Sequence, residues 1–176
     1  MSTNIYCLSI NFCYYTIIET NWVSCDNIIR EKGRCDFRME QDTCRKVMDM
    51  LDNNKYVQLL GIKIEEISLG HCKGKMEVSE QIKNPYGALH GGSLYSFADI
   101  IAGAAACTYG NPVVTVSGSM NFLVPAAGIE YIYCQADAVR QGKTLAVYDV
   151  KITDEIGNIL ENASFTFYII KNEKEK

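Results

Sequence analysis

The sequence predicts an α+β protein in which an antiparallel sheet of five or six strands wraps one long central helix. Six segments alternate apolar and polar residues with the period of a strand, and turn-forming residues separate them. One apolar run at residues 91–106 reads as a helix, and no strand–helix–strand repeat suggests a parallel sheet. A helix that is apolar on nearly every side must be covered on nearly every side, so the sheet is expected to curl around it.

A short amphipathic helix is expected before the sheet, over residues 40–54. Cys44, Val47, Met48 and Leu51 recur there at intervals of three and four residues. This spacing places them on one face of a helix that covers part of the core.

The strand candidates occur as two groups on either side of the long helix. The first two meet at Gly70 and predict a hairpin, and the sequences PAAG, QGK and DEIGN suit the turns that join the last four. The six expected strands span residues 62–70, 71–79, 113–124, 129–140, 144–153 and 159–170.

Composition favours a globular protein with no electrostatic footprint for nucleic acid. The 176 residues are 48% hydrophobic, which is enough for one packed domain. Lys and Arg number 17 against 21 Asp and Glu, so the basic surface that nucleic acid requires is not expected. The eight cysteines include no CxxC pair, so no metal site is predicted. No cleavable leader is evident, which points to the reducing cytoplasm.

The first 38 residues differ in character from the rest. They hold an apolar run of roughly 14 residues, too short to span a bilayer. We interpret residues 1–38 as an atypical extension upstream of a domain at 39–176, or as an added strand or interface arm, and expect no membrane span.

One carboxylate, Asp99, lies in the middle of the long apolar helix. Its neighbours at helical spacing are almost all small, whereas Leu94, Phe97 and Ile101 occupy the other side and are suited to the core. The acid is too far from the start of the helix to cap it. A carboxylate on a face with space beside it is a candidate catalytic group, although a structural pair with another residue would also explain it.

The helix begins with glycines. His90, Gly91 and Gly92 fall where backbone N–H groups have no acceptor within the helix, and the glycines let a ligand approach closely. Such amides suit a developing oxyanion. Asn84, before Pro85, is expected in an extended or turn conformation.

Taken together, Asn84, Gly87, the HGG triplet at 90–92 and Asp99 resemble the signature of the hotdog-fold acyl-CoA thioesterases of the PaaI (phenylacetyl-CoA thioesterase) type. The resemblance runs from about residue 56 to 170 and includes GKTLAV at 142–147. It implies a hotdog fold and hydrolysis of an acyl or aryl-acyl CoA thioester to the free acid and CoA. The first 38 residues have no counterpart in it.

The resemblance also implies roles for individual residues. Asp99 would be either the general base that activates water or a nucleophile that forms an anhydride, and the Gly91 amide would hold the carbonyl oxygen. His90 would bind or polarise the thioester, and Asn84 would position the water or the carbonyl. Ser117 would assist the acid.

Further residues are expected to hold the substrate. Gly87 and Gly92 would lie against it, and Arg140 and Lys143 would meet the phosphates of CoA, although solvated loop charges explain them equally well. CoA is part of the substrate, so no separate cofactor is expected. The resemblance implies a site shared between two protomers, hence an obligatory homodimer, and a homotetramer as the usual assembly.

Two other functions compete with hydrolysis. A non-catalytic acyl-CoA-binding sensor would keep the pocket but would not need Asp99. An acyl-thioester dehydratase would pair a histidine with an acid, yet the motif is more similar to that of the hydrolases. A Ser-His-Asp triad is disfavoured because the chain lacks a GxSxG elbow.

Overall fold

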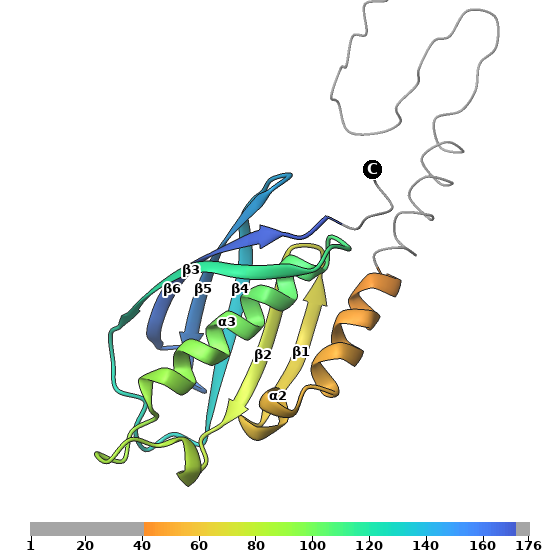
Figure 1. Ribbon diagram of the computed structural model, residues 1–176. Coiled ribbons are helices and arrows are strands. Elements are labelled where there is room, and N and C mark those ends of the chain that lie inside the picture. Colours follow the sequence, from red (N-terminus) through yellow and green to blue (C-terminus); the bar gives the residue numbers. More distant parts are fainter. Residues whose placement is uncertain (1–40, 172–176) are drawn as a thin grey trace, which may run out of the picture. The chain divides into compact units, whose positions relative to one another are not determined.

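The computed structural model describes residues 41–171 of the chain (Figure 1). The expected extension at 1–38, and the domain boundary drawn after it, lie outside these residues and stay predictions. The helices are residues 41–52, α2 (Lys55–Leu59) and α3 (Gly91–Cys107), with a 3-10 turn, η1 (Glu80–Ile82). The strands are β1 (Ile62–Ser68), β2 (His71–Glu77), β3 (Val113–Phe122), β4 (Tyr131–Gln141), β5 (Leu145–Thr153) and β6 (Ile159–Ile169).

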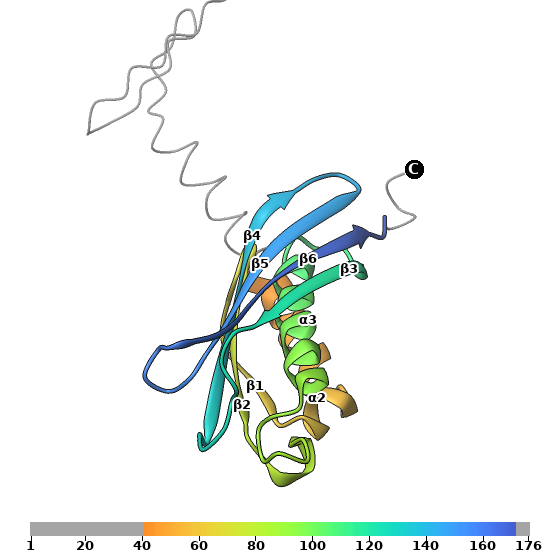
Figure 2. The same ribbon diagram turned by 90° about the vertical axis from the view of Figure 1, so that its left-hand side faces the viewer.

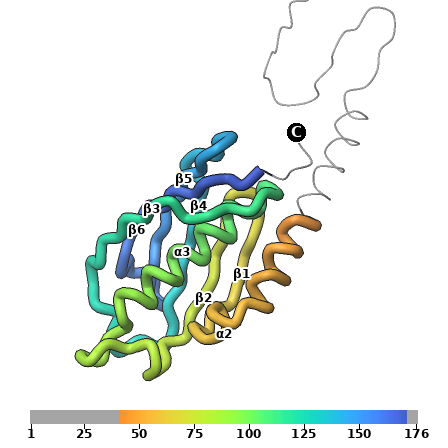
Figure 3. Tube along the Cα trace, in the orientation of Figure 1, coloured from red at the N-terminus to blue at the C-terminus, as the bar shows by residue number. Residues whose placement is uncertain are grey.

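The six strands form one antiparallel sheet in the order β1-β2-β4-β5-β6-β3. The sheet curls around α3, which is clear when the molecule is turned by 90° (Figure 2). This confirms the predicted α+β class and the wrapped helix. The chain path in Figure 3 shows that β3 follows α3 and lies beside β6, so β3 occupies an edge of the sheet.

The expected first helix forms at residues 41–52 and ends two residues earlier than predicted. A separate short helix, α2, which the sequence analysis did not predict, starts at Lys55. The cause is Asn54, whose side-chain oxygen accepts hydrogen bonds from the amides of Tyr56 and Val57 and so caps α2.

The bulky side of α3 forms the centre of the core, as the sequence predicts. Leu94, Phe97 and Ile101 are buried against the concave face of the sheet. The helix approaches β2 closely at Gly74, where an added Cβ would lie 2.7 Å from Ile101 Cδ1 and 2.9 Å from the Lys63 carbonyl oxygen. A side chain at Gly74 would therefore push the helix away from the sheet.

The far end of α3 is fixed by hydrogen bonds. The buried Thr108 hydroxyl donates to the Ala105 carbonyl and accepts from the amide of Gly70, in the β1–β2 turn. Gly70 has a φ of 72°, a left-handed conformation that favours glycine, and the turn confirms the predicted hairpin. Among residues 41–171, no helix is long and apolar enough to cross a membrane.

The contact at Gly74 yields a stability prediction. Gly74→Ala should lower the unfolding free energy by about 1–3 kcal/mol, because the new methyl group overlaps Ile101 and a backbone oxygen. Gly103→Ala is the matched control, since its Cβ would meet Phe167 at an ordinary 3.7 Å and alanine favours a helix by up to about 1 kcal/mol. Denaturant unfolding checks both, and equal stability of the two variants would contradict the close packing.

Candidate active site

The start of α3 is built by His90. Its ring atom Nδ1 accepts a hydrogen bond of 2.9 Å from the Gly92 amide, which makes His90 the N-cap. The His90 carbonyl accepts from the amides of Ser93 and Leu94. Because Nδ1 is the acceptor, the proton of the neutral ring lies on Nε2, and that N–H is the part of His90 that can meet a ligand.

The Gly91 amide differs from the other amides of the first turn. Within the described part of the chain it has no hydrogen-bond acceptor, while Gly92, Ser93 and Leu94 each have one. No acidic side chain lies in the first turn of α3 to neutralise the helix dipole. The Gly91 N–H is therefore a donor that remains for a ligand oxygen.

Asn84 shapes the loop that leads to the helix. Its side-chain oxygen accepts hydrogen bonds from the amides of Tyr86 at 2.9 Å and Ala88 at 3.2 Å. Gly87 completes the turn with a φ of 81°, and a Cβ there would meet nothing within 4 Å. Gly87 is thus needed for the backbone conformation of the loop. The nitrogen of the Asn84 side-chain amide therefore remains available to a ligand.

A cavity of about 260 Å³ lies beside these groups. It joins the Asn84 loop and the start of α3 to the end of β3 and to β6, and apart from Asn84 and Glu161 its walls are apolar or glycine. Its lining residues are Asn84, Ala88, Leu89, Gly91, Leu94, Phe122, Val124, Pro125, Ala126 and Glu161. The structure thereby brings together Asn84 and Gly91, two of the predicted site residues.

The Asp99 side chain is partly buried and, within the described residues, accepts one side-chain hydrogen bond. Thr115 on β3 donates its hydroxyl hydrogen to Asp99 Oδ1 at 2.8 Å. Burial raises the pKa of Asp99 above its ordinary value, and the hydrogen bond from Thr115 acts against that rise. One carboxylate oxygen is held in place by this hydrogen bond, and within the described residues Oδ2 has no hydrogen-bond partner.

Thr115, rather than Ser117, is the β3 residue whose hydroxyl contacts Asp99 in the structure. A bulge between Thr115 and Ser117 shifts the register of β3 against β6. Thr115 pairs with the inward-facing Phe167, whereas Ser117 pairs with Thr166, which alternates with the buried phenylalanines and so belongs to the outer face. The structure therefore does not bring the Ser117 side chain to Asp99 within one chain.

Asp99 and Gly91 are also apart within one chain. They are separated by eight positions (99 − 91) of the same helix, which is about 12 Å along the axis. Arg140 is the second-last residue of β4 and Lys143 lies in the β4–β5 turn, and both are exposed. That end of the sheet adjoins the β1–β2 turn and the C-terminus of α3, opposite to Gly91. A single ligand cannot meet all four in one protomer.

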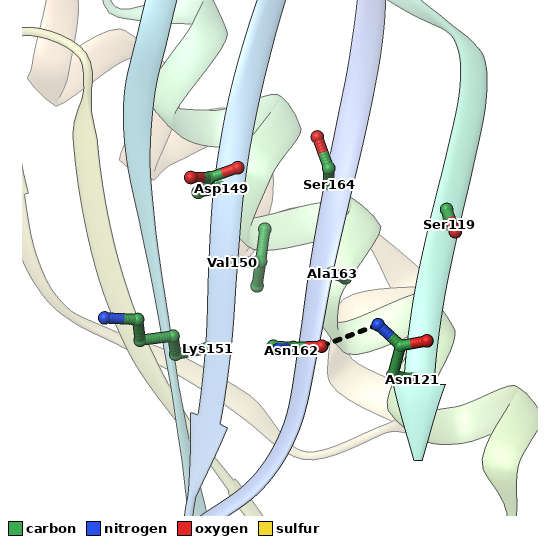
Figure 4. A pocket seen from close by; sticks show the side chains of 8 residues that line it. All are labelled: Ser119, Asn121, Asp149, Val150, Lys151, Asn162, Ala163 and Ser164. Carbon is green, nitrogen blue, oxygen red and sulfur yellow. Dashed lines mark hydrogen bonds between the residues drawn. The ribbon is translucent and has the colours of Figure 1, made fainter. Parts of the chain in front are cut away.

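A second depression lies on the outer face of the sheet, away from α3 (Figure 4). It is lined by polar side chains of β3, β5 and β6, and Asn121 donates a hydrogen bond of 2.8 Å to Asn162 across it. None of the predicted site residues lines it. The cavity beside Gly91 is therefore the candidate site.

Glu161 is the polar residue that the sequence analysis missed. It is 1% exposed, lines the cavity, and its Oε2 atom has no hydrogen-bond partner in the described residues. Burial raises its pKa from 4.5 to about 7. The signal was present in the sequence, because Glu161 shares its strand period with Ala163 and Phe165, which face the core.

This pKa yields a pH prediction. Between pH 4.5 and about 7 the folded protein keeps the Glu161 proton that the unfolded chain releases. The contribution of Glu161 to the unfolding free energy therefore falls as pH rises through this window, and it is constant above about pH 7. Glu161→Gln cannot titrate. The unfolding free energy of this variant, relative to the original protein, should therefore rise by roughly 3 kcal/mol across that window. Unfolding curves at several pH values check this, and a pH-independent difference would contradict the buried acid.

Comparisons with known proteins agree with this geometry. Residues 86–161 match the family described as the thioesterase superfamily. The acyl-coenzyme A thioesterase PaaI of Escherichia coli is 30% identical over 106 residues, which are 60% of this chain and 76% of that protein. The chain belongs to the thioesterase superfamily.

Solved structures support the same assignment. The structure of E. coli PaaI aligns with a TM-score of 0.71 at 24% identity, covering 77% of this chain and 96% of that one. A hypothetical thioesterase of Streptococcus pneumoniae with coenzyme A aligns with a TM-score of 0.61 at 31% identity, covering 63% of this chain and 87% of that one. The protein is a hotdog-fold, PaaI-like thioesterase, and its reaction is the hydrolysis of a thioester.

Proposed function

We propose that the substrate is an acyl or aryl-acyl CoA thioester, and that Asp99 and the Gly91 amide carry out its hydrolysis. The observation that carries this proposal is that the Gly91 N–H has no acceptor in the described chain and that Gly91 lines a cavity with mostly apolar walls. The acyl group occupies that cavity. A coenzyme A complex of a structural relative supports the choice of CoA.

The reaction follows from these groups. Asp99 removes a proton from water, and the water oxygen attacks the thioester carbon. The Gly91 N–H, at the positive end of α3, stabilises the oxyanion that forms, while Asn84 and the His90 Nε2–H orient the carbonyl. When the C–S bond breaks, the CoA thiolate takes the proton from Asp99, and the free acid leaves. Direct attack by Asp99 to form an anhydride is the other route that a carboxylate permits.

The active form is a homodimer in this proposal. Because Asp99 and Gly91 lie about 12 Å apart on one helix, a substrate meets both only if they come from different protomers. The free edge of β3 carries exposed Val114 and Val116 and is suited to pairing with a second copy. Arg140 and Lys143 of one protomer would then be available to the CoA phosphates bound near Gly91 of the other. A homotetramer would be a pair of such dimers.

The Asp99–Thr115 hydrogen bond yields a prediction about rate and pH. Thr115→Val should lower kcat by about 10- to 100-fold, the value of a lost hydrogen bond to a charged group. The bond favours the ionised carboxylate, so its loss should also raise the pKa of Asp99 and move the acidic limb of the kcat/KM profile to higher pH. Thr115→Ser should restore both, and Ser117→Ala is the control that should change neither.

The shared site is tested by mixing two inactive variants. Asp99→Asn should lower thiol release by about 10²–10⁴-fold. Gly91→Pro removes the N–H at the first helical position, where proline is tolerated, and should cost about 10²–10³-fold. After subunit exchange, half of the dimers contain one intact site, so activity should return to about a quarter of the original.

Gly91→Ala is the matched control for Gly91→Pro, because it adds a Cβ beside Phe122 but keeps the N–H. Its activity should exceed that of Gly91→Pro. If mixing restores nothing while sedimentation shows that exchange has occurred, the site lies within one protomer and the dimer proposal fails.

A further inference from the structure

Glu161 sits in a row of core residues. On the inner face of the sheet, Cys134 of β4 pairs with Ile152 of β5, Ile152 pairs with Glu161, and Glu161 pairs with Phe122 of β3. Cys134, Ile152 and Glu161 are each at most 1% exposed. An acidic side chain thus lies beside the packed core on its β5 side, while Phe122 on its β3 side is 55% exposed.

A carboxyl group in such a place needs a partner, because a buried polar atom without a hydrogen bond is destabilising. The described chain supplies none for Oε2. Among the residues that the structure describes, no lysine, arginine or histidine lines the cavity, and Asn84 is the other lining residue with a polar side chain. Since Glu161 lines the same cavity as Gly91, a bound ligand can supply the missing partner.

The ligand group must be a hydrogen-bond donor, and a neutral one fits best. Glu161 is the one acidic residue among the described residues that line the cavity, and most of the other walls are apolar. An ammonium ion would therefore be poorly solvated there. Burial favours the protonated form of Glu161, which has both a donor and an acceptor. A hydroxyl group matches this pair of functions.

We infer that Glu161 is a specificity-determining residue, which hydrogen-bonds a hydroxyl group carried by the acyl chain of the thioester. This inference rests on the proposed function, in which the thioester carbonyl lies at Gly91 and the acyl chain enters the cavity. A plain acyl chain would leave the carboxyl unpartnered in an apolar complex. The protein should therefore prefer hydroxylated acyl thioesters to plain ones of the same length.

The test compares hydroxylated and plain substrates. Hexanoyl- and octanoyl-CoA are assayed beside the corresponding esters with a hydroxyl group at each chain position in turn. At the best position, the kcat/KM ratio of hydroxylated to plain ester should be about 10 or more. Glu161→Leu should bring this ratio below one and raise kcat/KM for the plain ester. Glu161→Gln, which keeps a donor and an acceptor, should retain part of the preference.

Glu130→Leu is the matched control, because it removes an exposed carboxylate outside the cavity and should leave the ratio unchanged. Unfolding curves of each variant show whether it folds. The same ester pairs are also titrated calorimetrically into Asp99→Asn, with and without Glu161→Leu, so that binding is measured without turnover.

The outcomes separate the two proposals. If no CoA ester releases thiol, the proposed function fails, and the binding ratio alone decides the role of Glu161. If plain esters are hydrolysed and no hydroxyl position gives a preference, the inference about Glu161 is overturned while the proposed function stands. A preference that survives Glu161→Leu also overturns it.

Discussion

The close approach of α3 to the curled sheet is the constraint on which the rest of this structure depends. At Gly74 of β2 and Gly118 of β3 an added Cβ would overlap side-chain atoms of α3, from Ile101 and Tyr95, respectively. These two contacts, one with each strand, keep the helix from sliding or turning within the sheet. Because Gly91 and Asp99 belong to the same rigid helix, the packing that stabilises the core also sets the position of the free amide and of the acid.

The two carboxyl groups near the site differ in what surrounds them. Asp99 is partly buried and has a hydroxyl donor, Thr115, which favours its ionised form. Glu161 is buried, has no hydrogen-bond donor to its Oε2 among residues 41–171, and is held toward its neutral form by burial. Environment thus separates the two acids into one suited to proton removal from water and one suited to hydrogen bonding with a neutral group.

The sequence predicts the elements of this fold better than their arrangement. Strand period and turn residues were enough to find all six strands and α3. Pairing of β3 with β6 depends on contacts between distant segments, which no local pattern records. The bulge in β3 is similarly invisible, and it decides that Thr115 rather than Ser117 meets Asp99. The HGG motif located the free amide because the start of a helix leaves N–H groups unpaired by geometry alone.

Stability and selectivity are linked through Glu161. In the free protein its unpartnered oxygen lowers the stability of the fold at neutral pH, since the unfolded chain solvates the carboxylate fully. A ligand that hydrogen-bonds this oxygen binds only the folded state and therefore adds stability that grows with the logarithm of its affinity. An apolar ligand gains from the cavity walls but leaves the acid unpartnered. The residue that weakens the empty fold is thus the one that lets the cavity distinguish two acyl chains of equal length.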